Sequence, residues 1–164
     1  PYLEQRQKAI EAVLAKYPDI TIVGLYANDN DYEKALSQCE SVLLAHPDLA
    51  GFASTTTTGI PAAAQAIINA GLEGKVAVWG VAMPKQNAEY VKKGIVKGGL
   101  ALDSAKMTYL GVRITYDYLT KDKVLPVPGN DYGWAGVPVT DVEARFSYVP
   151  DTLLTPENVD TFGF

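Results

Sequence analysis

The stretch LAGFASTTTTGIPAAAQAIINAG, residues 49–71, decides the fold class. A short apolar run has the length of a β-strand, small hydroxyl residues follow it at 54–58, and an alanine-rich segment then has the composition of a helix. Pro61 is tolerated in the first turn of that helix, and Gly71 is a typical residue just beyond a helix end. A strand, a loop and a helix in this order predict one βα unit of an α/β fold.

The same alternation continues on both sides of this unit. It predicts helices at 3–17, 31–46, 60–70, 84–94 and 104–121, and strands at 20–27, 49–54, 74–81 and 95–102. Strands separated by helices indicate a parallel sheet flanked by helices. After about residue 121 the chain is rich in Pro, Gly and aromatic residues, which predicts an irregular tail with short strands.

The predicted series opens on a helix, whereas the first strand of a doubly wound sheet usually lies near its centre. We therefore expect these residues to be the C-terminal part of a longer chain, with the first strand of the sheet missing. A sheet without that strand would expose its interior, so we expect the 164-residue chain alone to be only marginally stable.

The composition of the chain excludes several classes of function. Hydrophobic residues make up 48% and charged residues 20% of the chain, which is typical of a globular protein. The net charge of −5 argues against nucleic acid as the main partner, and no run approaches the roughly 18 apolar residues of a membrane span. The single Cys39, at helical spacing with apolar residues, is interpreted as a small core residue, and the single His46 as a helix-end residue. A Cys/His zinc site or a Ser-His-Asp triad has too few residues to draw on.

Ligands of open α/β sheets bind beyond the carboxyl ends of the strands, which directs attention to the loops at 27–31, 54–61, 80–84 and 102–105. In the second loop, the free N–H groups of a helix start and the hydroxyls of Thr57 and Thr58 suit an oxygen-rich ligand. The small Ala62, Ala63 and Ala64 would let such a ligand approach the backbone. The alternative is that the threonines only satisfy the backbone of the loop, and the residues alone leave both readings open.

The other loops carry weaker patterns. Asp29 and Asp31, in the run NDND, favour a turn with a helix N-cap over a metal site. Trp79 is more typical of a core strand residue than of a sugar-stacking one. Asp103 would accept ligand hydroxyls or cap the helix that begins at Ser104. Tyr132, with the nearby Trp134, would line a pocket or form a lid over the sheet edge. No glycine-rich phosphate loop and no nucleophile–base pair is visible, so we expect neither cofactor nor catalysis.

Two longer runs, GIPAAAQAIINAG and KVAVWGVAMPKQNAEYVKKGIVKGGLALD, together with the ending TPENVDTFGF, carry a resemblance. Through them the chain resembles the solute-binding proteins of ABC sugar importers, and within these the autoinducer-2 and rhamnose-type subgroup. The resemblance covers nearly the whole chain. It implies a type I periplasmic-binding-protein-like lobe, in a protein whose two lobes clamp a ligand between them.

The resemblance also implies a domain assignment and a site. Residues 1–102 would form most of the C-terminal lobe, 103–125 a crossover helix of the N-terminal lobe, and 126–164 a tail across the lobes. Pro61, Ala63 and Asp103 match ligand-contacting or hinge-side positions of the family. Two departures leave the ligand open: the threonine run replaces a P-D-A-N-like run of autoinducer-2 binders and is closer to rhamnose-type members, and Leu102 replaces a Trp.

Three functions follow as hypotheses. The first is a receptor, periplasmic or a lipid-anchored extracellular protein, that closes around a small sugar-like ligand and delivers it to a membrane permease. It would meet the membrane only through that permease or a lipid anchor, and would need the missing N-terminal lobe. The second is the effector-binding part of a sugar-responsive transcription regulator. The third is a flavodoxin-like enzyme, which would need a reactive side chain on a strand-end loop.

Overall fold

The computed structural model describes residues 2–101, 103–121 and 152–162. The chain divides into two compact units, and we describe each by itself. The first unit comprises Pro1–Ala101 and Leu153–Phe164, and the second comprises Leu102–Thr152.

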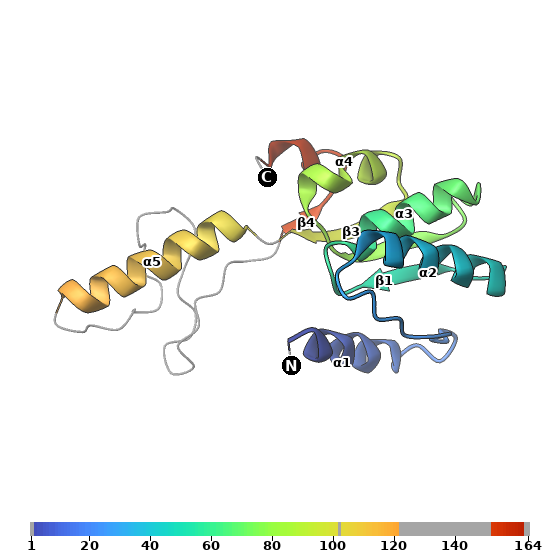
Figure 1. Ribbon diagram of the computed structural model, residues 1–164, viewed down its shortest axis with the longest axis horizontal. Helices are drawn as coiled ribbons and strands as arrows, with labels where there is room; N and C mark the ends of the chain where they lie inside the picture. The colour runs from blue at the N-terminus through green and yellow to red at the C-terminus, as the bar shows by residue number, and fades with distance from the viewer. Residues whose placement is uncertain (1, 102, 122–151, 163–164) are drawn as a thin grey trace. The chain divides into compact units, whose positions relative to one another are not determined.

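A sheet organises the first unit (Figure 1). Its strands follow one another in the order β1 (Gly51–Ser54), β2 (Ala77–Val81), β3 (Val96–Ala101) and β4 (Thr152–Leu154). β1 pairs with β2, and β2 with β3, both in parallel. α3 (Gly59–Asn69) and α4 (Pro84–Lys92) make the two crossovers between the parallel strands. The predicted α/β class, a parallel sheet flanked by helices, is confirmed.

The core lies between the sheet and a helical layer of α2 (Tyr32–Ala45), α3 and α4. α3 is the centre of this layer because it packs on β1 and β2 and also on both neighbouring helices. Six large aliphatic side chains of the core have at most 2% of their surface exposed: Ile60, Ile67, Val78, Val91, Ile95 and Val159. Burial on this scale stabilises a fold by about 1.5–3 kcal/mol for each large aliphatic side chain.

The ends of α3 and α4 follow the sequence signals. Thr58 is the N-cap of α3, and Gly71, just beyond its end, has a φ of +67°. Pro84 occupies the first turn of α4, where a missing N–H costs nothing, and Gly94 follows the helix with a φ of +69°. The helix limits predicted around the threonine run and around Pro84 are therefore confirmed to within two residues.

The predicted strand at 20–27 is wrong for this structure. The segment follows α1 (Tyr2–Leu14) and is exposed throughout, and it forms no strand with any described residue. β-branched residues supply strand propensity, but a strand also needs a partner for its backbone groups. The part of the chain that the structure describes offers no such partner to residues 20–27.

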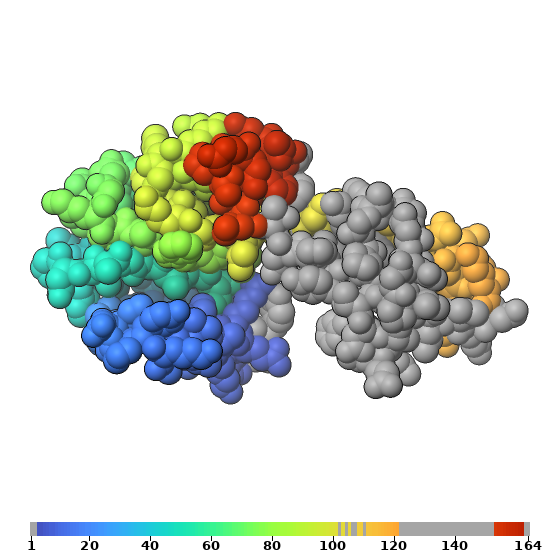
Figure 2. Space-filling view, turned by 180° about the vertical axis from the view of Figure 1, so that it is seen from behind, coloured from blue at the N-terminus to red at the C-terminus, as the bar shows by residue number. Residues whose placement is uncertain are grey.

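The C-terminal residues return to the first unit (Figures 1 and 2). Leu154 in β4 is 3% exposed and Val159 in the 3₁₀-helix η1 (Val159–Thr161) is 1% exposed, so both belong to the core. η1 packs on α4, where Lys92 Nζ lies 2.8 Å from Asp160 Oδ2. This hydrogen-bonded partner raises the pKa of Lys92, which keeps the amine charged.

The second unit is described by α5 (Ser104–Thr120), which confirms the helix predicted at 104–121. Asp117 is nearly buried and lies between Arg113 and Lys121, 3.3 and 3.4 Å from their nitrogens. Tyr132 and Trp134, named from the sequence as lid or pocket residues, lie outside the described residues. In the described ranges, no helix combines the length and the hydropathy needed to cross a bilayer.

Candidate functional site

Three loops of the first unit gather at one end of its sheet. β1 and β2 are parallel, so the loops that follow them, Ser54–Pro61 and Gly80–Pro84, leave from the same edge. The loop at 27–31 joins them through side-chain hydrogen bonds to the threonine run. This edge is where open α/β sheets bind ligands.

The threonine loop is held by its own hydroxyls. Ser54 Oγ donates to the carbonyl oxygen of Thr56 at 2.9 Å and accepts from the Thr56 N–H at 3.2 Å. Thr56 Oγ1 accepts from the Gly59 N–H at 3.3 Å and lies 3.4 Å from Thr58 Oγ1. The hydroxyls of Ser54 and Thr56 therefore satisfy backbone groups of the loop, which is the second of the two readings left open by the sequence.

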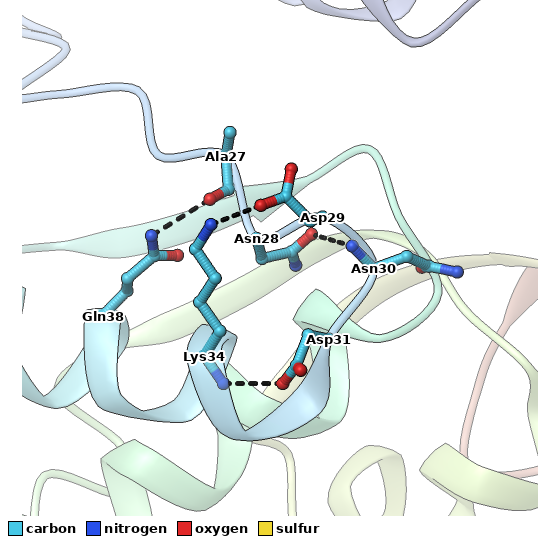
Figure 3. Close-up of polar contacts among 7 residues, drawn as sticks. All are labelled: Ala27, Asn28, Asp29, Asn30, Asp31, Lys34 and Gln38. Carbon is cyan, nitrogen blue, oxygen red and sulfur yellow. Dashed lines mark hydrogen bonds and ion pairs between the residues drawn. The ribbon is translucent and has the colours of Figure 1, made fainter.

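The asparagine loop is shaped by left-handed backbone and side-chain turns (Figure 3). Asp29 and Asn30 have φ values of +52° and +62°, a conformation that Asn and Asp tolerate better than most residues. Asn28 Oδ1 accepts from the Asn30 N–H at 3.0 Å. Asp31 caps α2 by accepting from the Lys34 N–H at 2.9 Å, while Lys34 Nζ pairs with Asp29.

The preferred reading of NDND as a turn with an N-cap is confirmed at Asp31. Both carboxylates of the run point to Lys34, one to its backbone and one to its amine (Figure 3). Over the described ranges, no group of His, Cys, Asp or Glu side chains has the grouping that a metal ion needs.

Hydrogen bonds between the loops involve residues that sequence reasoning passed over. Asn28 Nδ2 donates to Thr56 Oγ1 at 3.3 Å, and Thr58 Oγ1 donates to Asn30 Oδ1 at 3.1 Å. Arg6 in α1 donates from Nη1 to the Thr55 carbonyl oxygen at 3.0 Å. The sequence offers a reason to consider Asn28 and Asn30 as site residues, because they follow a strand-like segment. It offers no such reason for Arg6, which lies in a helix far from Thr55 in the sequence.

The predicted site residues fall into three groups. Thr57, Thr58 and Pro61 are half-buried at the loop and the first turn of α3, and only Thr58 has a side-chain hydrogen bond to a described residue. Ala63 is 1% exposed and lies in the core, beneath that turn. Asp103 comes two residues after the carboxyl end of β3 and belongs to the second unit.

The third loop begins in β2 at Gly80, a position that only glycine can occupy. Gly80 has a φ of +145°, and an added Cβ would lie 2.0 Å from the Ser54 carbonyl oxygen. Its neighbour Trp79 was expected in the core, but its side chain is 52% exposed, so that interpretation is wrong. The ring lies over Gly98 of β3, where an added Cβ would come within 2.0 Å of it. Glycine on the neighbouring strand leaves the indole room on the outer face.

The described groups that contact the threonine loop at this edge are neutral polar groups and the Arg6 guanidinium. Hydroxyls, amides and the Arg6 guanidinium border the loops, while Asp29 pairs with the Lys34 amine and Asp31 accepts from the Lys34 backbone N–H. Such groups donate to and accept from hydroxyl and carbonyl oxygens of a ligand. Among the described residues of these loops, none pairs a nucleophile with a base.

A family model and several solved structures match this chain. A family model described as a periplasmic binding protein domain matches residues 1–123. A sugar ABC transporter protein from Actinomyces odontolyticus superposes with a TM-score of 0.78 at 28% identity. Solute-binding proteins from Agrobacterium vitis, bound with alpha-D-tagatopyranose, and from Actinobacillus succinogenes, with bound D-allose, give TM-scores of 0.76 and 0.77 at 26% and 25% identity.

These matches cover almost all of this chain but only part of the others. They span 96%, 96% and 97% of its residues, and 52%, 46% and 50% of the three matched chains, in the same order. The chain thus spans about half the length of the structures that it matches. The matched proteins are solute-binding components of ABC transporters and not enzymes, which leaves the enzyme hypothesis without support.

Proposed function

The chain belongs to the periplasmic binding protein family, and from that premise we propose that it forms one wall of a cleft that binds a small sugar or sugar-like ligand. The complete protein would deliver this ligand to the permease of an ABC transporter. One observation carries the proposal: the Arg6 guanidinium of α1 and the amides of the loop at 27–31 meet the hydroxyls and carbonyls of the loop Ser54–Pro61, at the ligand-binding edge of the fold.

Thr57 and Thr58 are the proposed ligand donors and acceptors of this loop. Thr57 Oγ1 makes no hydrogen bond with any described residue, whereas Thr56 is occupied by its neighbours. Pro61, half-buried in the first turn of α3, is proposed as a further ligand contact. Ala63 would act from below, because a larger side chain in the core would push this turn away from the sheet.

Asp103 is proposed as the acceptor of a ligand hydroxyl from the strand end of β3. A carboxylate accepts hydrogen bonds from two neighbouring hydroxyls of a sugar, which neutral groups do less strongly. The threonine run favours a rhamnose-type sugar, with autoinducer-2 as the second choice within the same subgroup. The tagatose and allose bound by two of the matched proteins keep other sugars open.

The mechanism is closure of two lobes around the ligand. Residues 1–102 would supply most of one lobe, 103–125 a crossover helix of the other, and 126–164 a tail across both. A ligand that contacts both lobes binds the closed state more tightly than the open state, so it shifts the population towards closure. The permease would then recognise the closed form.

Membership of this family implies a periplasmic or extracellular location. A lipid anchor would hold the protein at the membrane in an organism without a periplasm. The effector-binding part of a transcription regulator shares this fold, but the matched sugar transporter proteins favour transport. We propose neither cofactor nor nucleic acid as a partner.

A thermal-shift screen of the complete gene product tests the proposal. Pentoses, deoxyhexoses, polyols and autoinducer-2 are added singly, and a ligand present at 100 times its Kd should stabilise the protein by about 2.7 kcal/mol. In the best complex, Asp103→Ala should weaken binding about 10- to 100-fold, and Thr57→Val about 10-fold.

Asp48→Ala is the matched control, because Asp48 precedes β1 and so lies at the amino end of the sheet. It should leave the affinity unchanged. The proposed site would be contradicted if Asp103→Ala, Thr57→Val and a bulky replacement of Ala63 all bound the ligand as the control does. The proposed function would fail if no sugar-like compound shifted the melting temperature.

A further inference from the structure

A chain of side-chain hydrogen bonds runs across the helical layer and joins α4, α3 and α2. The Tyr90 hydroxyl of α4 donates to Gln65 Oε1 of α3 at 3.1 Å, and Gln65 Nε2 donates to Asn69 Oδ1, one turn further along α3, at 2.9 Å. Asn69 Nδ2 then donates to Glu40 Oε1 of α2 at 2.8 Å. These four residues are called the polar chain below.

All three bonds of the polar chain run in one direction, from the Tyr90 hydroxyl to the Glu40 carboxylate. A carboxylate only accepts, so Glu40 fixes Asn69 with its nitrogen towards α2, and Asn69 in turn fixes the orientation of the Gln65 amide. A charged acceptor also makes a stronger hydrogen bond than a neutral one. Bonds that share groups in this way strengthen one another, so the polar chain acts as a unit.

The apolar packing of α3 constrains its position along its own axis only in part. α3 lies between α2 and α4 and packs on both (Figure 1). Its buried side chains include four alanines: Ala62, Ala63, Ala64 and Ala66. Small side chains form shallow ridges, which resist the sliding of one helix along another less than large side chains do. The polar chain bonds α4 and α2 to successive turns of α3, so it opposes a slide of α3 in either direction.

The three helices that the polar chain joins all begin at the ligand-binding edge of the fold. Their N-caps are Asp31, Thr58 and Met83, and each N-cap lies in one of the three loops of that edge. Gln65 and Tyr90 each lie seven residues beyond the N-cap of their helix. At the rise of an α-helix this is about 10 Å from the helix start. A bond at the same height on both helices therefore also sets where their first turns lie relative to each other.

We propose that the polar chain positions the ligand loops: it fixes α3 against α2 and α4, and so holds the three helix starts at one spacing around the ligand. The inference rests on the proposed function, because it gives a part in binding to residues that lie further along the helices than the loops. Tyr90 and Gln65 set α3 against α4, and Asn69 and Glu40 set α3 against α2. Groups that are held in place before binding lose less freedom on binding, so the ligand binds more tightly.

Nuclear magnetic resonance of the complete gene product tests the positioning without any ligand. Tyr90→Phe removes the hydroxyl and Gln65→Met removes the amide, while each keeps a side chain of similar size, so both variants should fold. Both should shift the backbone amide resonances of residues 57–60, at the start of α3. Ser41→Ala is the matched control, because Ser41 lies beside Glu40 and its hydroxyl bonds within α2, to the Ser37 carbonyl oxygen. Shifts no larger than those of the control would overturn the proposal, whatever the sugar screen finds.

The affinity for the best sugar of the screen is the second readout. Tyr90→Phe and Gln65→Met should each weaken binding about 3- to 10-fold. The melting temperature of the ligand-free protein should stay within about 4 °C of the unmodified protein.

A conservative change at the end of the polar chain separates positioning from mere packing. Glu40→Gln keeps an acceptor for Asn69 and should bind nearly as the unmodified protein does, whereas Glu40→Leu should lose as much affinity as Gln65→Met. Equal affinities of the two Glu40 variants would count against the inference. If no sugar binds, the proposed function fails together with the ligand part of this inference, while shifted resonances at residues 57–60 would still support the fixed spacing of the helix starts.

Discussion

At the scale of single residues, the hydroxyls of the threonine run differ in their hydrogen bonds to the rest of the chain. Thr56 serves the fold, because its hydroxyl joins Asn28, the Gly59 N–H and two other hydroxyls in one network. Thr57 has no such partner among the described residues, and we propose it as a ligand contact. Adjacent residues of one type thus differ in their partners, and composition alone does not separate them.

Replacing Thr56 by Val should lower the free energy of unfolding by about 1–2 kcal/mol, because the Asn28 amide and the Gly59 N–H lose their acceptor while the side chain keeps its shape. Urea unfolding of the complete gene product measures the change. Thr57→Val, in the same loop, should stay within about 0.5 kcal/mol of the unmodified protein. A larger loss for Thr57→Val than for Thr56→Val would reverse the assignment.

At the scale of elements, α2 shows how much a helical pattern predicts. Helical spacing predicted one apolar face of Leu36, Cys39, Val42 and Leu43. Val42 and Leu43 are buried, and Leu36 and Cys39 are partly buried against the core. His46 follows the helix as its C-cap, also as expected. The spacing of apolar residues predicts this buried face because successive turns of a helix present the same side to the core. The prediction does not depend on which element packs against the helix.

Cys39 should react slowly with alkylating reagents. Burial, and then the neighbouring Glu40, raise the pKa of its thiol from 9.0 to about 11, so the thiolate fraction near pH 8 falls about 100-fold. The raised pKa contributes stability that is complete below pH 9 and is lost as the pH rises through 11. Iodoacetamide labelling at pH 8, with the urea-unfolded protein as control, checks this, and equal rates would contradict it.

Strands were harder to predict than helices, for a physical reason that residues 20–27 and Trp79 illustrate. A helix closes its hydrogen bonds within itself, but the backbone of a strand needs a neighbour that a local pattern does not reveal. ITIVGLYA has the composition of a strand and no described partner. Trp79 was assigned to the core because it sits in a real strand, yet the glycine opposite it turns its ring outward.

The same limit applied to the candidate site. The threonine loop and the Asn loop were predictable as loops at the carboxyl ends of strands. Their connection through Asn28 and Thr58 was not, since it depends on which segments the sheet brings together. The hydrogen bond from Arg6 to Thr55 was not predictable from the sequence, because a lone Arg on an amphipathic helix has no local feature that indicates its partner.

At the scale of the whole molecule, the chain end completes the first unit. β4 lies beside β3, and η1 packs on α4, so residues far apart in sequence close one core. Two interactions hold this end: the exposed ion pair between Lys92 and Asp160, and the burial of Leu154 and Val159. Exposed ion pairs contribute little to stability, so the apolar contacts decide whether the end stays docked.

Two adjacent leucines of β4 provide the test of that balance. Leu154 is 3% exposed and contacts the core, whereas Leu153 is 51% exposed on the other face of the same strand. Leu154→Ala should lower the free energy of unfolding by about 2–5 kcal/mol, because it removes buried methyl groups and leaves a cavity. Leu153→Ala should cost less than about 1 kcal/mol. Urea unfolding with limited proteolysis of the end measures both, and similar losses for the two variants would show that the end is not part of the core.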